Sequence, residues 1–407
     1  MQKQNCKITI FTQVYNAAPY LKQCVESILK QTYTNFQYII VDNGSIDESK
    51  EILENYAIQD KRIVLVRYEK NIPCVRWFSS VRDLGKGEYV TNLDADDWWD
   101  LNYLESLLEF LQKNSLDLAI TGTMNYFEET KTHRVMRKLD KPVIMTQYDF
   151  AKNYSKFWTF PSTVWGCIAK MELYKSPNFY ATLQQPFVYG LDTVAMLEYI
   201  KQCNYIGIDN TALYHYRIHP KSVSYAYNPA RFDSNIGYYK LIREFLELHH
   251  VFDVQKRNWL KRVHLSSMMA TLNILKQANI EAKSKLLECA RIASHPLTTL
   301  ALTAQGDERI QWIQLVQDIA MQAVSEINSK EEADAIREYF VEKFPECGKV
   351  FSFETLVLFR EEPKLWNCLF QDYREGMLAC IREWIASAKY DASVDLGSLM
   401  EQIVPET

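Results

Sequence analysis

The stretch EYVTNLDADDWW, residues 88–99, joins a strand, a cluster of acids and the approach to a helix. Its first half consists of β-forming residues from Tyr89 to Leu93. Leucines at three- and four-residue spacings follow the acids, which predicts a helix from about Leu101 to Leu111. Ligands of open α/β sheets bind where strands end in this way, so the sequence predicts a ligand site at the acids.

Asp94 and Asp96 lie two residues apart. In an extended backbone their side chains therefore face the same side and can share one hard divalent cation. A solvated loop is the alternative interpretation of this pair. Asp97 is well placed to be the N-cap of the following helix. An EF-hand is not indicated, because the glycine and the closing glutamate of that loop are missing.

Composition limits the class of protein. The 407 residues are too many for one ordinary core, so two domains are expected. A hydrophobic content of 47% and a charged content of 24% are typical of a soluble globular protein. The net charge of −5 gives no reason to expect a nucleic-acid partner. Nine scattered cysteines, without CxxC or zinc spacing, predict reduced thiols in the cytoplasm. Neither a signal peptide nor a membrane span is predicted, and peripheral contact with a membrane remains open.

Strands and helices alternate in the first half of the chain. Strands are predicted at residues 7–14, 36–41, 62–67 and 88–93, with helices at 16–30 and from the Ser45–Glu48 capping box to about Tyr56. This order with short connections predicts a mostly parallel sheet with helices on both faces. Polar groups follow three of the strands, which favours one ligand site at that edge of the sheet. Neither GxGxxG nor a P-loop is present.

Two segments carry a resemblance to a known family: VYNAAPYLKQCVESILKQTYTNFQYIIVDNGSID at residues 14–47 and GEYVTNLDADDWW at residues 87–99. They resemble family 2 of the inverting nucleotide-sugar glycosyltransferases, which have the GT-A fold, a Rossmann-like α/β architecture. The likeness covers residues 5–230, and we expect the GT-A domain at residues 1–234. It implies transfer of a sugar, UDP-linked by expectation, to a hydroxyl of a glycan or lipid-linked acceptor. Bacterial surface polysaccharides such as capsule or lipopolysaccharide, assembled at the inner face of the membrane, fit this activity.

The resemblance also implies roles for single residues. Val14, Tyr15 and Asn16 would lie along the nucleotide base, and Asp42 would accept a hydrogen bond from it. Asp94 and Asp96 are similar to the two acids of the DxD motif. Asp94 would lie near the ribose and the metal, and Asp96 would ligate Mn²⁺ or Mg²⁺.

Asp192, in YGLD at residues 189–192, is similar to the general base that takes the acceptor proton. Capping of the following helix is its alternative role. In YHYRIHPKSVS, residues 214–224, Arg217 and His219 are candidates to hold diphosphate oxygens, whereas His215 is expected to be structural. Trp165 could stack on a sugar or belong to the core.

The chain also departs from the family pattern. Gln13, Asn43 and Leu191 replace a proline, an aspartate and a glutamate that are common in the family. Pro73 and the Trp77–Ser79 stretch stand where the family has glycine and Ala-Arg-Asn. Phe78 thus takes the place of a donor-binding arginine, and Arg76 or Arg82 could substitute for it.

Residues 235–407 are expected to form an all-α domain with apolar residues at helical spacing, including a capping box at Ser329 and Glu332 and a helix over 365–390. It could dock a partner enzyme, a second copy of the chain or a membrane surface. Two other functions remain for the whole chain: a non-catalytic interaction protein with a decayed transferase domain, or an NDP-sugar nucleotidyltransferase. The second lacks its glycine-rich turn after the first strand.

Overall fold

The computed structural model describes residues 7–72, 81–183, 190–219 and 226–281, and parts of the stretch from 284 to 319. It divides into two compact units. Unit 1 comprises residues 1–225 and 240–252, and unit 2 comprises residues 226–239 and 253–407. The predicted boundary after residue 234 falls inside helix α10 (Ala230–Leu248) and stays a prediction.

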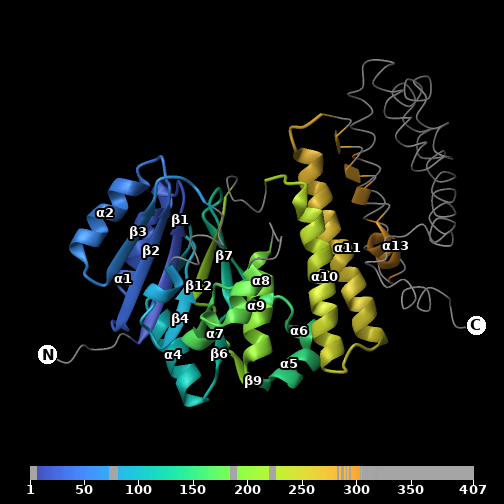
Figure 1. Cartoon of the computed structure of the whole chain (residues 1–407), viewed down its shortest axis with the longest axis horizontal. Helices are drawn as coiled ribbons and strands as arrows, with labels where there is room; N and C mark the ends of the chain where they lie inside the picture. The colour runs from blue at the N-terminus through green and yellow to red at the C-terminus, as the bar shows by residue number, and fades with distance from the viewer. Residues whose placement is uncertain are drawn as a thin grey trace, which may run out of the picture. The chain divides into compact units, whose positions relative to one another are not determined.

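Four parallel strands form the first half of the main sheet of unit 1 (Figure 1). They are β1 (Ile8–Val14), β2 (Phe36–Asn43), β3 (Ile63–Tyr68) and β4 (Tyr89–Asn92), in the order β3-β2-β1-β4. Helix α1 (Ala18–Leu29) connects β1 to β2, and helix α2 (Ser49–Gln59) connects β2 to β3. The predicted alternation of strands and helices is confirmed.

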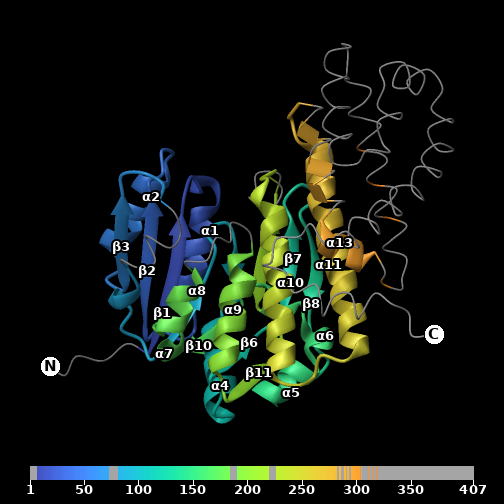
Figure 2. The same ribbon diagram turned by 45° about the vertical axis from the view of Figure 1, so that its right-hand side comes forward.

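The second half completes an eight-stranded sheet in the order β3-β2-β1-β4-β10-β6-β11-β9 (Figure 2). Here β10 (Cys167–Lys170) runs antiparallel to both β4 and β6 (Leu118–Ile120). Strand β11 (Tyr205–Ile208) is parallel to β6, and β9 (Val143–Thr146) is antiparallel to β11. The sheet is therefore mostly parallel, as predicted.

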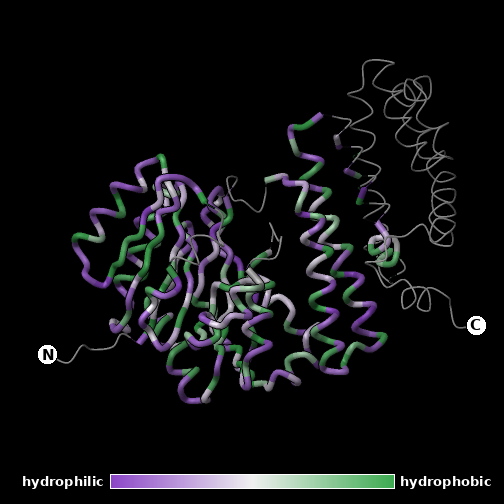
Figure 3. The backbone as a smooth tube through the Cα atoms, viewed as in Figure 1, coloured by the Kyte–Doolittle hydropathy of each residue, from purple (hydrophilic) through white to green (hydrophobic). Residues whose placement is uncertain are grey.

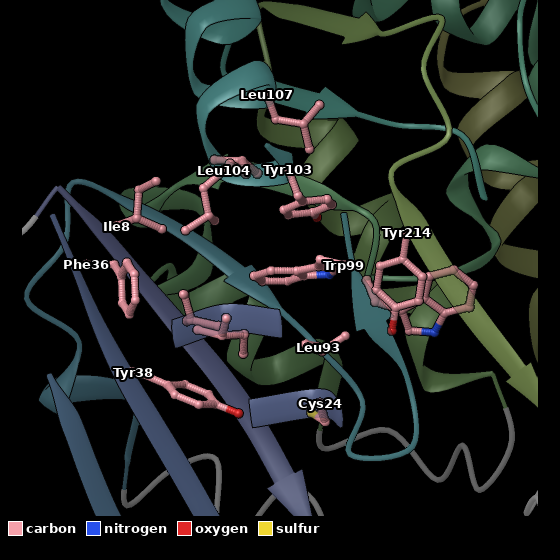
Figure 4. Packing of buried hydrophobic residues seen from close by; sticks show 14 of the residues in the cluster. Ile8, Cys24, Phe36, Tyr38, Leu93, Trp99, Tyr103, Leu104, Leu107 and Tyr214 are labelled. Atoms are coloured by element: carbon pink, nitrogen blue, oxygen red, sulfur yellow. The ribbon is translucent and has the colours of Figure 1, made fainter. Parts of the chain in front are cut away.

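Helices cover both faces of this sheet. Side chains of β1 alternate between the two faces, and they are packed on both. Ile8, Ile10 and Val14 belong to a core cluster with residues of α1 and of helix α4 (Tyr103–Lys113). On the other face, the ring of Phe11 stacks on Tyr174 of α7 (Met171–Tyr174) at 5.1 Å. Figure 3 shows hydrophobic segments along these central strands, and Figure 4 shows the first layer from close by. The GT-A architecture expected from the resemblance is confirmed.

A second, four-stranded sheet has the order β5-β12-β7-β8. It consists of β5 (Trp98–Trp99), β12 (Tyr214–Ile218), β7 (Thr123–Phe127) and β8 (Thr132–Arg137). The remaining elements of unit 1 are η1 (Arg82–Leu84), α5 (Gln147–Lys152), α6 (Tyr154–Phe157), η2 (Phe160–Ser162), α8 (Pro177–Leu183) and α9 (Leu191–Gln202). Strand β5 begins directly after the acids at residues 94–97. The second sheet therefore holds the C-terminal end of the segment that carries the candidate site.

Two predicted helix caps are wrong. Helix α4 begins at Tyr103 with Asn102 as its N-cap, so Asp97 does not cap it. Helix α2 begins at Ser49, and the Ser45–Glu48 capping box is not formed. The backbone N–H of Ser49 donates instead to Asp47 Oδ1 at 3.0 Å.

Unit 2 is helical in its described part. It contains α11 (Val254–Gln277), α13 (Pro296–Ala301) and the part of α10 up to Tyr239. Its core includes Phe232, Leu265, Met268 and Leu272. The helices predicted around Ser329 and over 365–390 lie outside the described residues. Within the part of the chain that the structure describes, every helix is too short or too polar to cross a bilayer.

Candidate active site

The acids after β4 form a turn that is fastened to β12. The backbone N–H of Asp97 donates to the carbonyl of Asp94 at 3.1 Å. The Asp97 side chain is fully buried, and its Oδ2 accepts the hydroxyl of Tyr214 at 2.7 Å. Its Oδ1 accepts the backbone N–H of Arg217, also at 2.7 Å. Instead of capping a helix, Asp97 therefore fixes the turn that carries Asp94 and Asp96.

Asp94 lies near Asp192, which comes from the first turn of α9. Although Asp94 reaches solvent, the protein around it raises the pKa of its carboxyl, and the charges of Asp192 and Asp96 raise it further. Burial raises the pKa of Asp192 to about 6. Among the described residues, neither carboxylate receives a hydrogen bond. The structure thus brings together two acids that are far apart in the sequence and leaves both available to a ligand.

Asp192 is not the N-cap of its helix. Helix α9 begins at Leu191, and its N-cap is Gly190, whose φ of 64° lies in the left-handed region that glycine tolerates. The capping alternative for Asp192 is therefore wrong. The role of Asp192 as a base stays a prediction, and its raised pKa and its position beside Asp94 are compatible with that role.

Arg217 and His219 both contact Asp96. His219 Nε2 lies 3.0 Å from Asp96 Oδ2, and Arg217 Nε donates to the backbone carbonyl of Asp96 at 2.7 Å. The buried Arg217 guanidinium also bonds to Glu128 and Gln23. Binding of diphosphate oxygens by Arg217 stays a prediction. The bonds to Asp96, Glu128 and Gln23 use three of the five guanidinium N–H groups, so two remain for phosphate oxygens.

The residues predicted to bind the base lie together at the ends of β1 and β2. Val14 pairs with Asp42 in the β1–β2 register. Asn16, with a φ of 52°, receives the Ile46 N–H on its Oδ1 at 2.8 Å. Tyr15, next to it, is 45% exposed and so is accessible to a base. Side-chain hydrogen bonds therefore join the turn after β1 to the turn after β2.

Asp42 already has two protein partners. Its Oδ1 accepts the Ser45 N–H at 3.0 Å, and its Oδ2 accepts Arg67 Nε–H at 3.1 Å. Arg67 was not singled out from the sequence, because its partner Asp42 lies on the neighbouring strand. A carboxylate oxygen has a second lone pair, so binding of a base by Asp42 stays a prediction.

Asn43, which departs from the family pattern, is fully buried and makes three hydrogen bonds. Its Nδ2 donates to Asn71 Oδ1 at 3.0 Å and to the Ile72 carbonyl at 2.9 Å. Its Oδ1 accepts the Ile72 N–H at 3.0 Å. An ionised aspartate cannot donate either of the first two bonds, which explains the amide at this position.

Other candidates have structural positions. Trp165 is buried and stacks on the rings of Tyr214 and Tyr216, with centroid distances of 4.4 and 5.3 Å, so the core alternative holds. His215 bonds Asp100 Oδ1 at 2.9 Å and stacks on Trp98, as expected of a structural residue. The guanidinium of Arg82 lies over the ring of Tyr180. Arg76 and Phe78 lie outside the described residues.

Asp94 and Asp96 could contribute to a metal site but do not complete one. No group of three or more His, Cys, Asp or Glu side chains that could hold a metal occurs among the described residues. Mg²⁺ is commonly held by one or two carboxylates together with phosphate oxygens of a substrate. Among the described residues no group donates a hydrogen bond to the Asp94 carboxylate, and the negative charges of Asp192 and Asp96 repel it. This donor set fits a divalent cation whose coordination a phosphorylated ligand completes.

The chain is similar in sequence to known glycosyltransferases. Residues 9–175 match the family model described as glycosyl transferase family 2. EpsH of Bacillus subtilis (strain 168), whose name describes a glycosyltransferase, is 25% identical over 74% of this chain and 86% of that protein. TuaG of the same organism, named for teichuronic acid biosynthesis, is 35% identical over 28% of this chain and 46% of that protein. Among solved structures, S. aureus TarS 1–349 with UDP-GlcNAc has a TM-score of 0.47 and 15% identity, over 88% of this chain and 92% of that one.

Proposed function

We propose that this protein transfers a sugar from a nucleotide-sugar to a hydroxyl of a glycan or lipid-linked glycan, with inversion at the anomeric carbon. The match of residues 9–175 to the glycosyl transferase family 2 model supports this proposal. The proposed donor is UDP-linked. The family and the relatives support a glycosyltransferase in general, and the choice of donor, acceptor and stereochemistry is our proposal.

One observation carries the proposal of a catalytic site. Asp192 lies close enough to Asp94 for its charge to raise the pKa of the Asp94 carboxyl. In a transferase of this type, the base and the donor-binding acids must meet around one sugar. A carboxyl with a pKa of about 6 is also well matched to proton transfer near neutral pH.

In the proposed reaction, Asp192 takes the proton of the acceptor hydroxyl while that oxygen attacks the anomeric carbon from the side opposite the diphosphate. Asp96 and Asp94 would hold Mn²⁺ or Mg²⁺, and a bound cation supplies neutralisation of negative charge on the departing diphosphate. His219 and Arg217 support Asp96 through its carboxylate and its backbone carbonyl. Val14, Tyr15, Asn16 and Asp42 would bind the nucleotide.

The proposed setting is the assembly of a bacterial surface glycan in the cytoplasm, at the inner face of the membrane. The name of TuaG, which refers to teichuronic acid biosynthesis, supports a surface polymer as the acceptor class. The chain spans less than half of the length of TuaG. Contact of the helical unit with a membrane or a second copy is part of the same proposal.

The test is a screen of nucleotide-sugars with Mn²⁺, scored by release of the nucleoside diphosphate in the presence of candidate glycan acceptors. Binding is measured separately as a UDP-dependent rise in melting temperature, because a ligand that binds the folded state stabilises it. We expect stabilisation by UDP and donor turnover that is lost in Asp192→Asn. Absence of both stabilisation and turnover would favour the non-catalytic interaction protein. Stabilisation with unchanged turnover in Asp192→Asn would remove Asp192 from the role of base.

A further inference from the structure

Thr193, the residue after Asp192, links the start of α9 to a neighbouring segment. Its Oγ1 donates to the backbone carbonyl of Ser162 at 3.0 Å. Ser162 is the last residue of η2, against which α9 packs. The N-cap of α9 is Gly190, which has no side chain to cap the helix. The Thr193 hydroxyl therefore anchors the helical turn that carries Asp192.

Arg137, at the end of β8, holds the segment that receives this bond. Its guanidinium donates to the Phe160 carbonyl at 3.1 Å and to Thr163 Oγ1 at 2.7 Å, and it also bonds the carbonyl of Thr159. A further bond reaches Ser162 Oγ at 3.3 Å. Arg137 thus contacts four of the five residues from 159 to 163 and fixes the backbone on both sides of Ser162.

The environment of Arg137 is unusual for an arginine. The residue is 4% exposed, and burial lowers the pKa of its guanidinium to about 10. Among the described residues no carboxylate pairs with it. Its hydrogen-bond partners are neutral oxygens of Thr123 and of residues 159–163, and its guanidinium also lies over the rings of Phe160 and Trp165, at 5.6 and 5.1 Å. Burial of an unpaired charge is unfavourable for stability. A role in fixing the 159–163 segment accounts for its position.

We propose that Arg137 and Thr193 are positioning residues for Asp192: Arg137 fixes the 159–163 segment, and Thr193 joins this segment to the first turn of α9. The inference rests on the proposed role of Asp192 as general base. Neither residue touches the substrate in this scheme. Each helps to orient the Asp192 carboxylate toward the acceptor hydroxyl. Their loss should therefore lower the rate of the chemical step rather than the affinity for the donor.

The first test is Thr193→Val, which keeps the shape of the side chain and removes the donor to Ser162. A misplacement of about 1 Å at a reacting group costs about 100-fold in rate. We therefore expect kcat to fall by about 10- to 100-fold, with the donor KM changed less than about threefold. Thr193→Ser keeps the hydroxyl and should restore kcat. Thr271→Val is the control for loss of a helical threonine hydroxyl elsewhere, in α11 of unit 2. This hydroxyl donates to the Ser267 carbonyl at 3.0 Å and accepts from Asn235 Nδ2 at 3.1 Å, so its removal should lower stability without changing the start of α9.

Arg137→Lys tests the other half of the link, because lysine keeps the charge but not the fork of donors. If both residues act through the same segment, Thr193→Val should reduce kcat less in the Arg137→Lys background than in the wild type. Additive effects of the two substitutions on kcat would overturn the link between them. So would loss of stability in both single variants with no change in kcat.

Hydrogen–deuterium exchange of a peptide covering residues 190–202 gives a readout that does not depend on activity. Both Thr193→Val and Arg137→Lys should speed exchange in the first turn of α9, and Thr271→Val should not. Unchanged exchange in the two variants would refute the positioning role whatever the kinetics. A wild-type protein without transferase activity would instead overturn the proposed function, and the exchange data would then still decide whether Arg137 and Thr193 fix the start of α9.

Discussion

Replacing Asn43 with aspartate changes one buried amide into a carboxyl of the same shape. The Asn43 amide donates to Asn71 Oδ1 at 3.0 Å and to the Ile72 carbonyl at 2.9 Å. The N–H and carbonyl of Ile72 both bond to this amide, which fixes the positions of its nitrogen and oxygen. An ionised carboxyl would place a negative oxygen against two acceptors in a site with no solvent exposure.

The expected penalty depends on pH. Each acceptor left without a donor costs about 1–3 kcal/mol, so we take about 3 kcal/mol for the ionised variant. The protonated carboxyl still leaves one acceptor without a donor, at about 1 kcal/mol, so ionisation itself costs about 2 kcal/mol more. At 1.36 kcal/mol per pKa unit, this difference raises the pKa of the new carboxyl by about 1.5 units, from about 4 in the unfolded chain to about 5.5 in the folded one. Between these values the folded state binds more protons than the unfolded state. The variant therefore loses stability relative to the wild type as pH rises from about 4 to about 5.5.

The assay is the difference in melting temperature between Asn43→Asp and the wild type, measured by circular dichroism from pH 4 to pH 8. About 2–4 °C per kcal/mol applies to a domain of this size, which gives a gap of about 6–12 °C above pH 7. Near pH 4 the protonated carboxyl donates one bond, and the gap should shrink to a few degrees. Asn55→Asp introduces the same charge at an exposed position within α2 and should change stability little at either pH. A gap that is independent of pH, or none at pH 7.5, would refute the reasoning.

Three further predictions concern the candidate site. In Asp192→Asn, turnover should fall by about 10²- to 10⁴-fold with little change in donor affinity. The wild-type kcat/KM should decrease below about pH 6, where the base becomes protonated, and a kcat/KM that stays constant from pH 7 down to pH 5 would contradict this role. Removal of divalent cations with EDTA should abolish transfer, and Mn²⁺ should restore it in the wild type but not in Asp96→Ala; full activity in EDTA would exclude the metal role. Tyr214→Phe leaves buried Asp97 without its hydroxyl donor, so unfolding free energy should fall by about 1.5–3 kcal/mol in urea titrations, whereas wild-type stability would show that the Asp97–Tyr214 bond does not hold the turn.

The sequence predicted those features that depend on local pattern. The strands from β1 to β4 and helices α1 and α4 follow from their apolar periodicity, and this alternation also indicates the mostly parallel sheet. The position of Asp192 could not be derived from its local sequence, which fits a helix cap equally well. Only the likeness to a family suggested that it meets Asp94, and the structure places the two acids near each other.

Long-range contacts were the features that the sequence did not reveal. Asp97 has the residue type and spacing of a helix cap, but Tyr214 and Arg217 bind its carboxylate, and both lie more than a hundred residues further along the chain. Arg137 and Glu128 likewise had no recognisable signal, because their partners come from other segments of the fold. Strands β5, β7 and β8 are short or exposed, so alternation of apolar residues did not distinguish them from loops.

The position of β6 in the main sheet has a consequence for synthesis of the protein on the ribosome. This strand, completed at Ile120, is flanked by β10 and β11, which are translated later. Strand β11 begins roughly 85 residues after β6, which at about 5–20 residues per second corresponds to a wait of about 4–17 s. During this interval the apolar strand Leu118–Ile120 lacks its β11 neighbour, and until residue 170 is translated it lacks β10 as well. We therefore expect slow codons between residues 120 and 205 to increase aggregation during expression.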